Sequence, residues 1–317
     1  MTATAVLVIP DEIIAALSKK SQACIERLRK HKPDLTNECV WRLFLIDRTV
    51  WPASGWLGWS PKTVSCFPPL YRHANLYNQP SVNRLAAVLV LLYERAGGLR
   101  VLLTTRSKEL RSHPGQTALP GGKADEGDAG LVETALREAN EEVALPLRSP
   151  HVHTLCTLEP FVSQRRLLVT PVIALLDDVS VLEELRAAPR EVARIFDHPL
   201  EALLEPELAR REELAALGGE DWPYETELHN TTDVPWLGGM YRMHRFRTTA
   251  SPVKGFTADI LLATAAIAYA REPVFQRWGE GQLRTFAEVL PAVEAVAALS
   301  QPSPPDGHYA PTMTVKA

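Results

Sequence analysis

The chain has 317 residues, of which 46% are hydrophobic and 23% charged, a balance ordinary for a folded globular protein. Its formal net charge of −4 gives no basis for nucleic-acid binding or for adsorption to an anionic membrane. The four cysteines are scattered without metal-ligand spacing, which argues against a zinc site or a disulfide framework and predicts reduced thiols.

No targeting or membrane-spanning signal is evident. The N-terminus lacks a basic segment followed by an apolar stretch, and the longest apolar run is far shorter than the roughly 20 residues that span a bilayer. The final residues, 314–317, do not form an SKL-type peroxisomal address. We therefore expect an intracellular protein without a membrane span.

Residues 1–81 are predicted to be an N-terminal extension containing one helix and one irregular segment. Apolar residues recur at helical spacing from Asp11 to His31, with Asp11 as the expected N-cap and a solvated basic face. The irregular segment is rich in tryptophans, which we expect to pack against the main domain: Trp41, Trp51, Trp56 and Trp59.

The main domain is predicted over residues 82–272. A continuous apolar run, Leu85–Tyr93, is typical of a strand buried on both faces, and a glycine turn leads into a second hairpin strand, Arg100–Arg106. The further elements expected are strands at 167–175 and 241–246, short helical turns at 189–196 and 200–204, an inserted loop near 205–235, and a helix at 257–269. Strands and helices around one mixed sheet indicate an α+β or α/β layered domain.

Residues 273–317 are predicted to form a C-terminal helix and a disordered, proline-containing tail beyond about Gln301.

A glycine-containing loop at 120–128 carries the first chemical signal. Gly121 and Gly122 allow main-chain N–H groups to approach a phosphate or a metal-bound water closely. Asp128 is the predicted cap of a helix that begins near Ala129.

Three glutamates follow on that helix. Apolar residues at helical spacing form one stripe to be buried: Val132, Leu136, Ala139 and Val143. Glu138, Glu141 and Glu142 are expected on the side turned away from the stripe, where their mutual repulsion favours a hard divalent cation, Mg²⁺ or Mn²⁺. Arg137 can orient one carboxylate. The glutamates alone would fit an ordinary solvated acidic face; the preceding loop and Arg137 favour the metal site.

Residues 122–145 resemble the Nudix box, GX5EX7REUXEEXGU. The REXXEE core is intact from Arg137 to Glu142. The chain departs from the pattern in having Asp128 for the first glutamate, one extra residue before Arg137, Ala139 for a bulkier apolar residue, and Ala144 for glycine. The resemblance supports metal binding but does not define the role of Asp128.

Residues 102–122 resemble a longer pattern, LLTxR[SA]x3Rx3Gx3FPGG, found in the coenzyme A pyrophosphatase subgroup of Nudix hydrolases. Only Leu119, where the pattern has phenylalanine, departs from it. The substrate-binding residues that this implies are Arg106, Arg111, Gly115, Gly121 and Gly122. Two arginines before a phosphate-binding loop would clamp the diphosphate or the 3′-phosphate, whereas the alternative is that they are surface charges.

The resemblance implies an α+β fold, namely a Nudix-type α/β/α sandwich with a mixed β-sheet and a loop–helix–loop catalytic motif. It implies hydrolysis of coenzyme A (CoA), or of an acyl or oxidised form, to 3′,5′-ADP and a 4′-phosphopantetheine product. The peroxisome or mitochondrion is the implied compartment, with the cytoplasm as the alternative.

Roles for the acidic residues follow from this reaction. Glu138 and Glu142 are the first-choice ligands of Mg²⁺ or Mn²⁺, with Glu141 as a ligand or a water-positioning base. Arg137 orients, and Glu191 is the candidate for a further acid from outside the box; its alternative is an exposed carboxylate at a helix start.

Two rival functions remain. One is a Nudix enzyme acting on another nucleoside diphosphate derivative, including an oxidised dNTP, which the upstream pattern counts against. The other is a non-catalytic nucleotide-binding module, which the presence of all three glutamates counts against.

Overall fold

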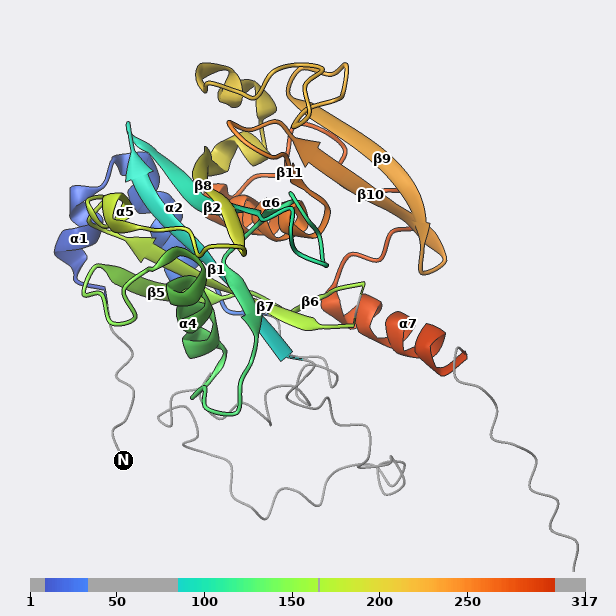
Figure 1. Ribbon diagram of the computed structural model, residues 1–317, viewed down its shortest axis with the longest axis horizontal. Coiled ribbons are helices and arrows are strands. Elements are labelled where there is room, and N and C mark those ends of the chain that lie inside the picture. The colour runs from blue at the N-terminus through green and yellow to red at the C-terminus, as the bar shows by residue number, and fades with distance from the viewer. Residues whose placement is uncertain (1–8, 34–84, 165, 300–317) are drawn as a thin grey trace, which may run out of the picture.

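The computed structural model describes residues 9–33, 85–164 and 166–299, drawn in colour in Figure 1. The tryptophan-rich segment and the tail beyond Gln301 lie outside these residues. Within the described part of the chain, no helix combines the length and apolar character needed to cross a bilayer.

The N-terminal extension contains two helices where one was predicted. α1 spans Asp11–Ala16 and α2 spans Lys19–Lys30, and the chain between them is extended at Leu17. The Ser18 hydroxyl accepts a hydrogen bond from the Ser21 amide (3.3 Å) and so caps α2. Helical spacing of apolar residues did not reveal this break, because it continues across both helices. The expected N-cap was also wrong, since Pro10 occupies that position and Asp11 lies in the first turn.

The central sheet is built around two long parallel strands. β1 (Leu85–Arg95) runs parallel to β7 (Leu168–Leu176) and antiparallel to β2 (Gly98–Arg106), which confirms the predicted hairpin and core strands. The order is β3-β2-β1-β7-β5, with β4 also on β1, β6 on β7 and β8 on β2. The short and outer strands are β3 (Thr117–Ala118), β4 (Gly121–Lys123), β5 (Val152–Thr157), β6 (Phe161–Val162) and β8 (Val192–Pro199).

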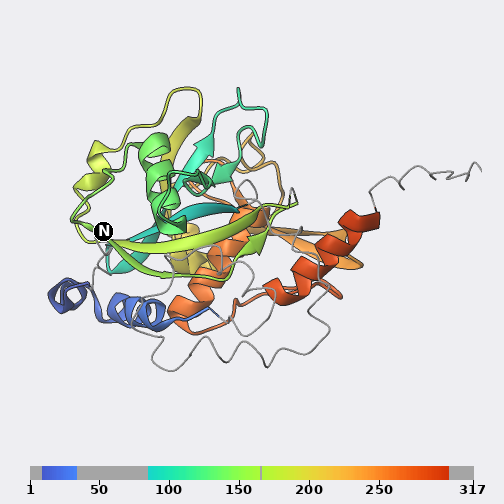
Figure 2. The ribbon, with the colours of Figure 1, turned by 90° about the horizontal axis from the view of Figure 1, so that it is seen from below.

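Helices cover both faces of this sheet, as Figure 2 shows. Because side chains alternate along a strand, Leu89 and Leu91 of β1 pack toward α4 (Leu131–Val143) on one face. Val90 and Leu92 pack toward α2 and α6 (Gly255–Tyr269) on the other face. The α+β class, the α/β/α layers and the mixed sheet are thus as predicted. The last helix, α7 (Phe286–Leu299), packs beside β6.

Two expectations for the second half were wrong. Residues 189–196 are not a helical turn: from Val192 they form β8, whose alternating burial suits an outer strand paired with β2. The loop expected at 205–235 contains a 3₁₀ helix (Pro206–Arg211) and ends in β9 (His229–Trp236). A 3₁₀ helix at Leu200–Leu203 and a small α5 (Val181–Glu184) complete this region.

A second sheet extends from the main body. β9 pairs with β10 (Gly239–Phe246), and β10 pairs with β11 (Val253–Lys254), all antiparallel. The strand predicted at 241–246 and the helix predicted at 257–269 are confirmed within β10 and α6. β11 leads directly into α6, so the second sheet is joined to the helix that covers the first.

Candidate active site

Two adjacent glycines bring β4 against both β1 and α4. β4 pairs with residues 86–88 of β1. A Cβ atom added at Gly121 would lie 2.4 Å from the carbonyl oxygen of Ala87, so the backbones approach more closely than any side chain permits. A Cβ at Gly122 would lie 2.4 Å from the carboxylate carbon of Glu138. The space left by these glycines admits the glutamates of α4 to the edge of the sheet.

Asp128 supports the arginine of the box. α4 begins at Leu131 with Gly130 as its N-cap, so the prediction that Asp128 caps the helix was wrong. Instead its carboxylate accepts hydrogen bonds from Arg137 Nε (2.8 Å) and Nη2 (3.0 Å), and from the Thr134 hydroxyl (2.8 Å) and the Asp125 amide (3.0 Å). The bond from Arg137 is the main reason that the pKa of Asp128 falls to about 2.

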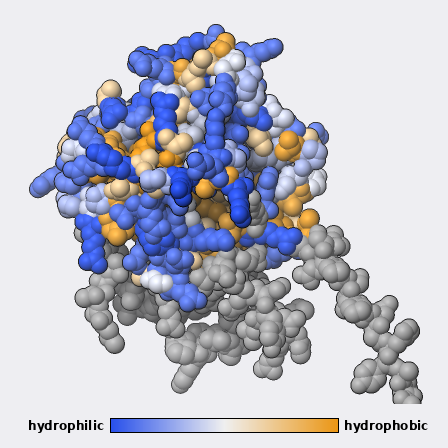
Figure 3. Space-filling model, viewed as in Figure 1, coloured by the Kyte–Doolittle hydropathy of each residue, from blue (hydrophilic) through white to orange (hydrophobic). Residues whose placement is uncertain are grey.

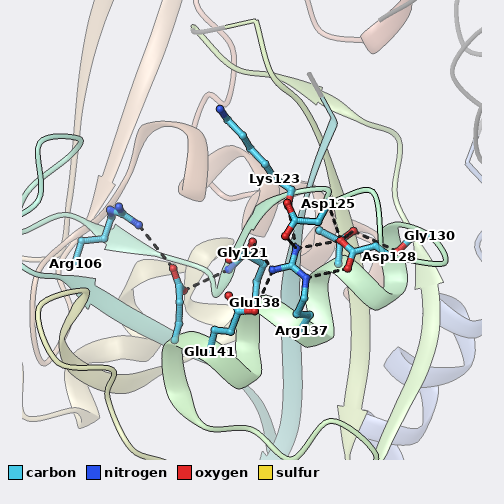
Figure 4. A network of polar contacts seen from close by, with 11 residues as sticks. Arg106, Gly121, Lys123, Asp125, Asp128, Gly130, Arg137, Glu138 and Glu141 are labelled. Carbon is cyan, nitrogen blue, oxygen red and sulfur yellow. Dashed lines mark hydrogen bonds and ion pairs between the residues drawn. The ribbon is translucent and has the colours of Figure 1, made fainter. Parts of the chain in front are cut away.

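Arg137 in turn holds two of the three glutamates, as Figure 4 shows. Its Nη1 donates to Glu138 Oε1 (3.0 Å) and to Glu141 Oε1 (3.2 Å). Its Nη2 also donates to the carbonyl of Lys123 (3.0 Å), which ties the helix to β4. Arg137 therefore orients the carboxylates and offsets part of their mutual repulsion.

Glu142 differs from its neighbours because it is buried, with 7% of its surface exposed. The prediction that it faces away from the apolar stripe was wrong, since its carboxylate points toward the glycine edge of the sheet. Its Oε2 accepts a long hydrogen bond from the Gly121 amide (3.4 Å), and its Oε1 lies 3.9 Å from Arg106 Nη1. Burial raises the pKa of Glu142 to about 7, against the opposing effect of Arg106.

Glu191 is exposed and immediately precedes β8, so it is not at a helix start. Its carbonyl accepts a hydrogen bond from the Ser107 amide (2.8 Å), which fixes it beside the end of β2. Its charge contributes to the raised pKa of Glu142, so the two carboxylates are near neighbours. The candidate further acid therefore lies close to the box.

The loop after β2 brings one of the two predicted arginines to the glutamates. Gly115, at φ +67°, closes this loop by donating from its amide to the carbonyl of Arg106 (3.0 Å). Arg106 is half-buried beside Glu142. Arg111 lies on the exposed part of the loop and forms no ion pair with the described residues. Of the two predicted arginines, one thus lies at the glutamates and the other on the exposed part of the loop.

The donor set fits a hard divalent cation, although it is not a preformed cage. Among the residues that the structure describes, no three acidic, histidine or cysteine groups converge as a ligand set. The reason is that Glu138 and Glu141 are turned toward Arg137, while Glu142 faces Arg106. Mg²⁺ commonly keeps several waters and uses only one or two carboxylates, so a cage is not required. The all-oxygen donors and the space that Gly122 leaves against Glu138 suit such an ion.

Sequence reasoning missed the residues that support this site. Thr134, Lys123 and Asp125 hold Asp128 and Arg137 through a hydroxyl, a carbonyl and an amide. Only Thr134 carries a sequence signal, because it lies on the same helix face as Arg137, three residues before it. The two main-chain contacts depend on the path of the loop.

Part of the chain matches a known family of proteins. Residues 83–217 match the family model for the NUDIX domain. The chain is 39% identical to Nudix hydrolase 15, mitochondrial, of Arabidopsis thaliana over 195 aligned residues. These aligned residues make up 60% of this chain and 60% of the relative. It is 37% identical to Nudix hydrolase 22, chloroplastic, of the same plant over 195 residues, or 60% of this chain and 57% of that one. The aligned part thus spans about 60% of the length of these relatives.

A bacterial relative and a solved structure also match. The chain is 49% identical over 100 residues to an uncharacterized Nudix hydrolase NudL of Yersinia enterocolitica, or 32% of this chain and 49% of that one. The NUDIX domain of Shewanella oneidensis NrtR, crystallised with ADP ribose, matches 49% of this chain and 88% of that chain at 23% identity, with a TM-score of 0.30. The family match confirms the Nudix resemblance of the segment, and the relatives' names state no substrate.

Proposed function

We propose that this chain, through the NUDIX domain matched at residues 83–217, hydrolyses the diphosphate bond of CoA or its derivatives. The products would be 3′,5′-ADP and a 4′-phosphopantetheine compound, and the cofactor Mg²⁺ or Mn²⁺. The observation that carries the proposal is the 3.9 Å approach of Arg106 to Glu142. It joins the upstream loop pattern and the glutamate box in one site, as a substrate clamp beside a metal site requires.

A bound divalent cation would supply a more acidic water and neutralise charge on the non-bridging phosphate oxygens. Glu138 and Glu142 would hold it, because their carboxylates line the glycine edge of the sheet. Glu141, whose side chain is 55% exposed, would position a water and accept its proton at a carboxylate oxygen. Glu191, beside Glu142, is the alternative proton acceptor.

The arginines divide into two tasks. Arg137 orients Glu138 and Glu141, while its bidentate bond to Asp128 keeps it from moving toward the substrate. Arg106 would bind a diphosphate oxygen next to the carboxylates, and Arg111 would reach the substrate from the exposed loop. The open backbone at Gly121 and Gly122 leaves room for the diphosphate.

For the compartment, the names of the two plant relatives, one mitochondrial and one chloroplastic, favour an organelle. Of the two organelles predicted from the resemblance, we propose the mitochondrion over the peroxisome.

The test is incubation of the full chain with CoA and either Mg²⁺ or Mn²⁺, followed by chromatography for 3′,5′-ADP. An oxidised dNTP and ADP-ribose serve as competing substrates. The substrate assignment is wrong if CoA remains intact while either competitor is consumed.

Two glutamate variants distinguish a loss of metal binding from a general effect of removing a carboxylate nearby. We expect Glu142→Gln to lower kcat by about 100-fold or more, because it removes a charged group at the reacting centre. Glu126→Gln is the matched control, since Glu126 is an exposed carboxylate in the loop before α4. Full activity of Glu142→Gln would exclude the metal role.

A further inference from the structure

Two cationic side chains lie side by side outside the box. Arg245 on β10 and Lys254 on β11 are directly opposite each other in the antiparallel pair. Directly opposite residues project from the same face of a sheet, with Cβ atoms about 5 Å apart, and like charges in that position are destabilising. A negative charge near both cations would relieve this repulsion.

Neither cation meets an acidic group among the described residues. Arg245 donates from Nη1 to the Thr232 hydroxyl (2.8 Å) and the Asn230 side-chain oxygen (3.3 Å), and it stacks over the Tyr224 ring at 5.2 Å. Its Nη2 also contacts Met243 Sδ (3.3 Å), and all four partners are neutral. Lys254 is half-buried, and both burial and the charge of Arg245 lower its pKa. The pair therefore presents positive charge that no carboxylate of the described structure offsets.

The following helix adds to this potential. Lys254 is the residue that precedes α6, and no side chain caps the first N–H groups of that 15-residue helix. A helix N-terminus carries a partial positive charge, so it does not relieve the repulsion between the two cations. Two cationic residues and one helix start of the same sign are thus neighbours where β11 leads into α6.

This place adjoins the proposed substrate loop. Ser251, three residues before Lys254, bonds through its hydroxyl to those of Thr105 (2.8 Å) and Thr117 (2.7 Å). Thr257 on α6 also donates to the carbonyl of Thr117 (3.2 Å). Thr105 and Thr117 flank the loop that carries Arg111. At about 3.3 Å per residue of extended chain, Lys254 lies on the order of 10 Å from the base of that loop.

The same relation is visible in the figures. In Figure 1, β11 and the start of α6 lie beside the loop between β2 and β3. Figure 3 shows that this face of the molecule is hollowed near its middle. The start of α6 therefore lies next to the proposed substrate loop.

We propose that Arg245, Lys254 and the start of α6 form a subsite for a phosphate monoester of the substrate. This inference rests on the proposed function, in which Arg106 and Arg111 hold the diphosphate. For CoA the group bound would be the 3′-phosphate, a dianion that would offset both cations and accept bonds from the helix N–H groups. The subsite would distinguish CoA from diphosphates that lack a further phosphate.

The test compares the affinities of the full chain for CoA and for 3′-dephospho-CoA, which differ only in that phosphate. Calorimetry in EDTA prevents turnover, so binding is measured by itself. We expect the wild type to bind CoA about tenfold or more tightly, the scale of a charge-assisted contact. Lys254→Met should bring the ratio close to 1, while Lys254→Arg should retain most of it. Lys19→Met, which removes an exposed cation on α2, is the matched control and should keep the full ratio.

Each outcome decides between the possibilities. A wild-type ratio close to 1, or a ratio that survives in both Lys254→Met and Arg245→Met, overturns the subsite. Because the ratio is taken within one variant, a general loss of folding would weaken both ligands and would not imitate the expected result. If the ratio behaves as expected but CoA is not cleaved with Mg²⁺ or Mn²⁺, the proposed reaction is wrong and the subsite stands.

Discussion

Replacing Gly122 by alanine should lower the activity of the protein strongly without unfolding it. The added Cβ would lie 2.4 to 2.5 Å from the carbon and both oxygens of the Glu138 carboxylate. These atoms are the end of a flexible side chain, so they can move aside while the backbone stays in place. Gly122 lies in β4 outside the positive-φ region, which alanine tolerates.

The size of the effect follows from the displacement. Ordinary van der Waals contact begins at 3.4 Å, so the carboxylate must move by about 1 Å. A displacement of about 1 Å in a reacting centre can cost roughly 100-fold in rate. Restricting the unfolded chain by replacing glycine with alanine stabilises by about 0.4–1 kcal/mol, so Tm should be unchanged or slightly raised.

The assay measures kcat for CoA at several Mn²⁺ concentrations, together with thermal unfolding. Gly127→Ala is the control from the same loop, because its Cβ would have no neighbour within 4 Å. Gly121→Ala gives the contrasting case: its Cβ would meet the backbone of Ala87 at 2.4 Å, so it should lower Tm. Wild-type activity and metal dependence in Gly122→Ala would refute the placement of Glu138 as a ligand.

Three further predictions concern stability. Ala144 ends α4 at φ +59°, so Ala144→Gly should raise the free energy of unfolding by about 1 kcal/mol in urea titrations, and a loss would contradict this. The pKa of Asp128 is lowered from 3.8 to about 2, so the stabilisation by its charged form is complete above pH 4 and is lost as the pH falls toward 2. The difference in unfolding free energy between the wild type and Asp128→Asn should therefore narrow from pH 4 to pH 2. A constant difference would show that the ion pair with Arg137 does not stabilise the fold. Burial raises the pKa of Asp259, which accepts a hydrogen bond from the Tyr241 hydroxyl (2.7 Å), from 3.8 to about 7. Its contribution to stability is therefore lost as the pH rises from about 4 to about 7 and stays constant above that. Asp259→Asn should remove a slope of up to about 1.4 kcal/mol per pH unit in this window, and an unchanged slope would rule Asp259 out.

The core strands could be predicted because a short, continuous apolar run is typical of a strand buried on both faces. Leu85–Tyr93 is buried except at Val88, which is partly exposed, and Leu168–Leu176 is buried throughout, as strands between two helical layers are expected to be. β8 escaped prediction because Pro189 and the charged residues after it resemble a helix start. Its strand identity comes from pairing with β2, a contact far away in the sequence.

The sequence predicted which residues belong to the candidate site, but not the directions and contacts of their side chains. Helical spacing placed Glu142 with the exposed glutamates, yet the direction of a side chain also depends on what faces the helix. Here a glycine edge accepts a carboxylate where another residue would exclude it. The role of Asp128 likewise depends on the loop path, which brings it back to Arg137 across nine positions. Local periodicity contains neither piece of information.

Because α2, α6 and α7 cover apolar side chains of the sheet, a stable fragment of this protein must include all three helices. The first two pack against Val90 and Leu92, while α7 adds Phe286 and Leu290 to a cluster at the starts of β1 and β7. A fragment trimmed to residues 83–217 would keep every acidic group of the site but expose a broad apolar sheet face to water. We expect such a fragment to aggregate, because the residues that carry the chemistry are fewer than those needed to keep the sheet soluble.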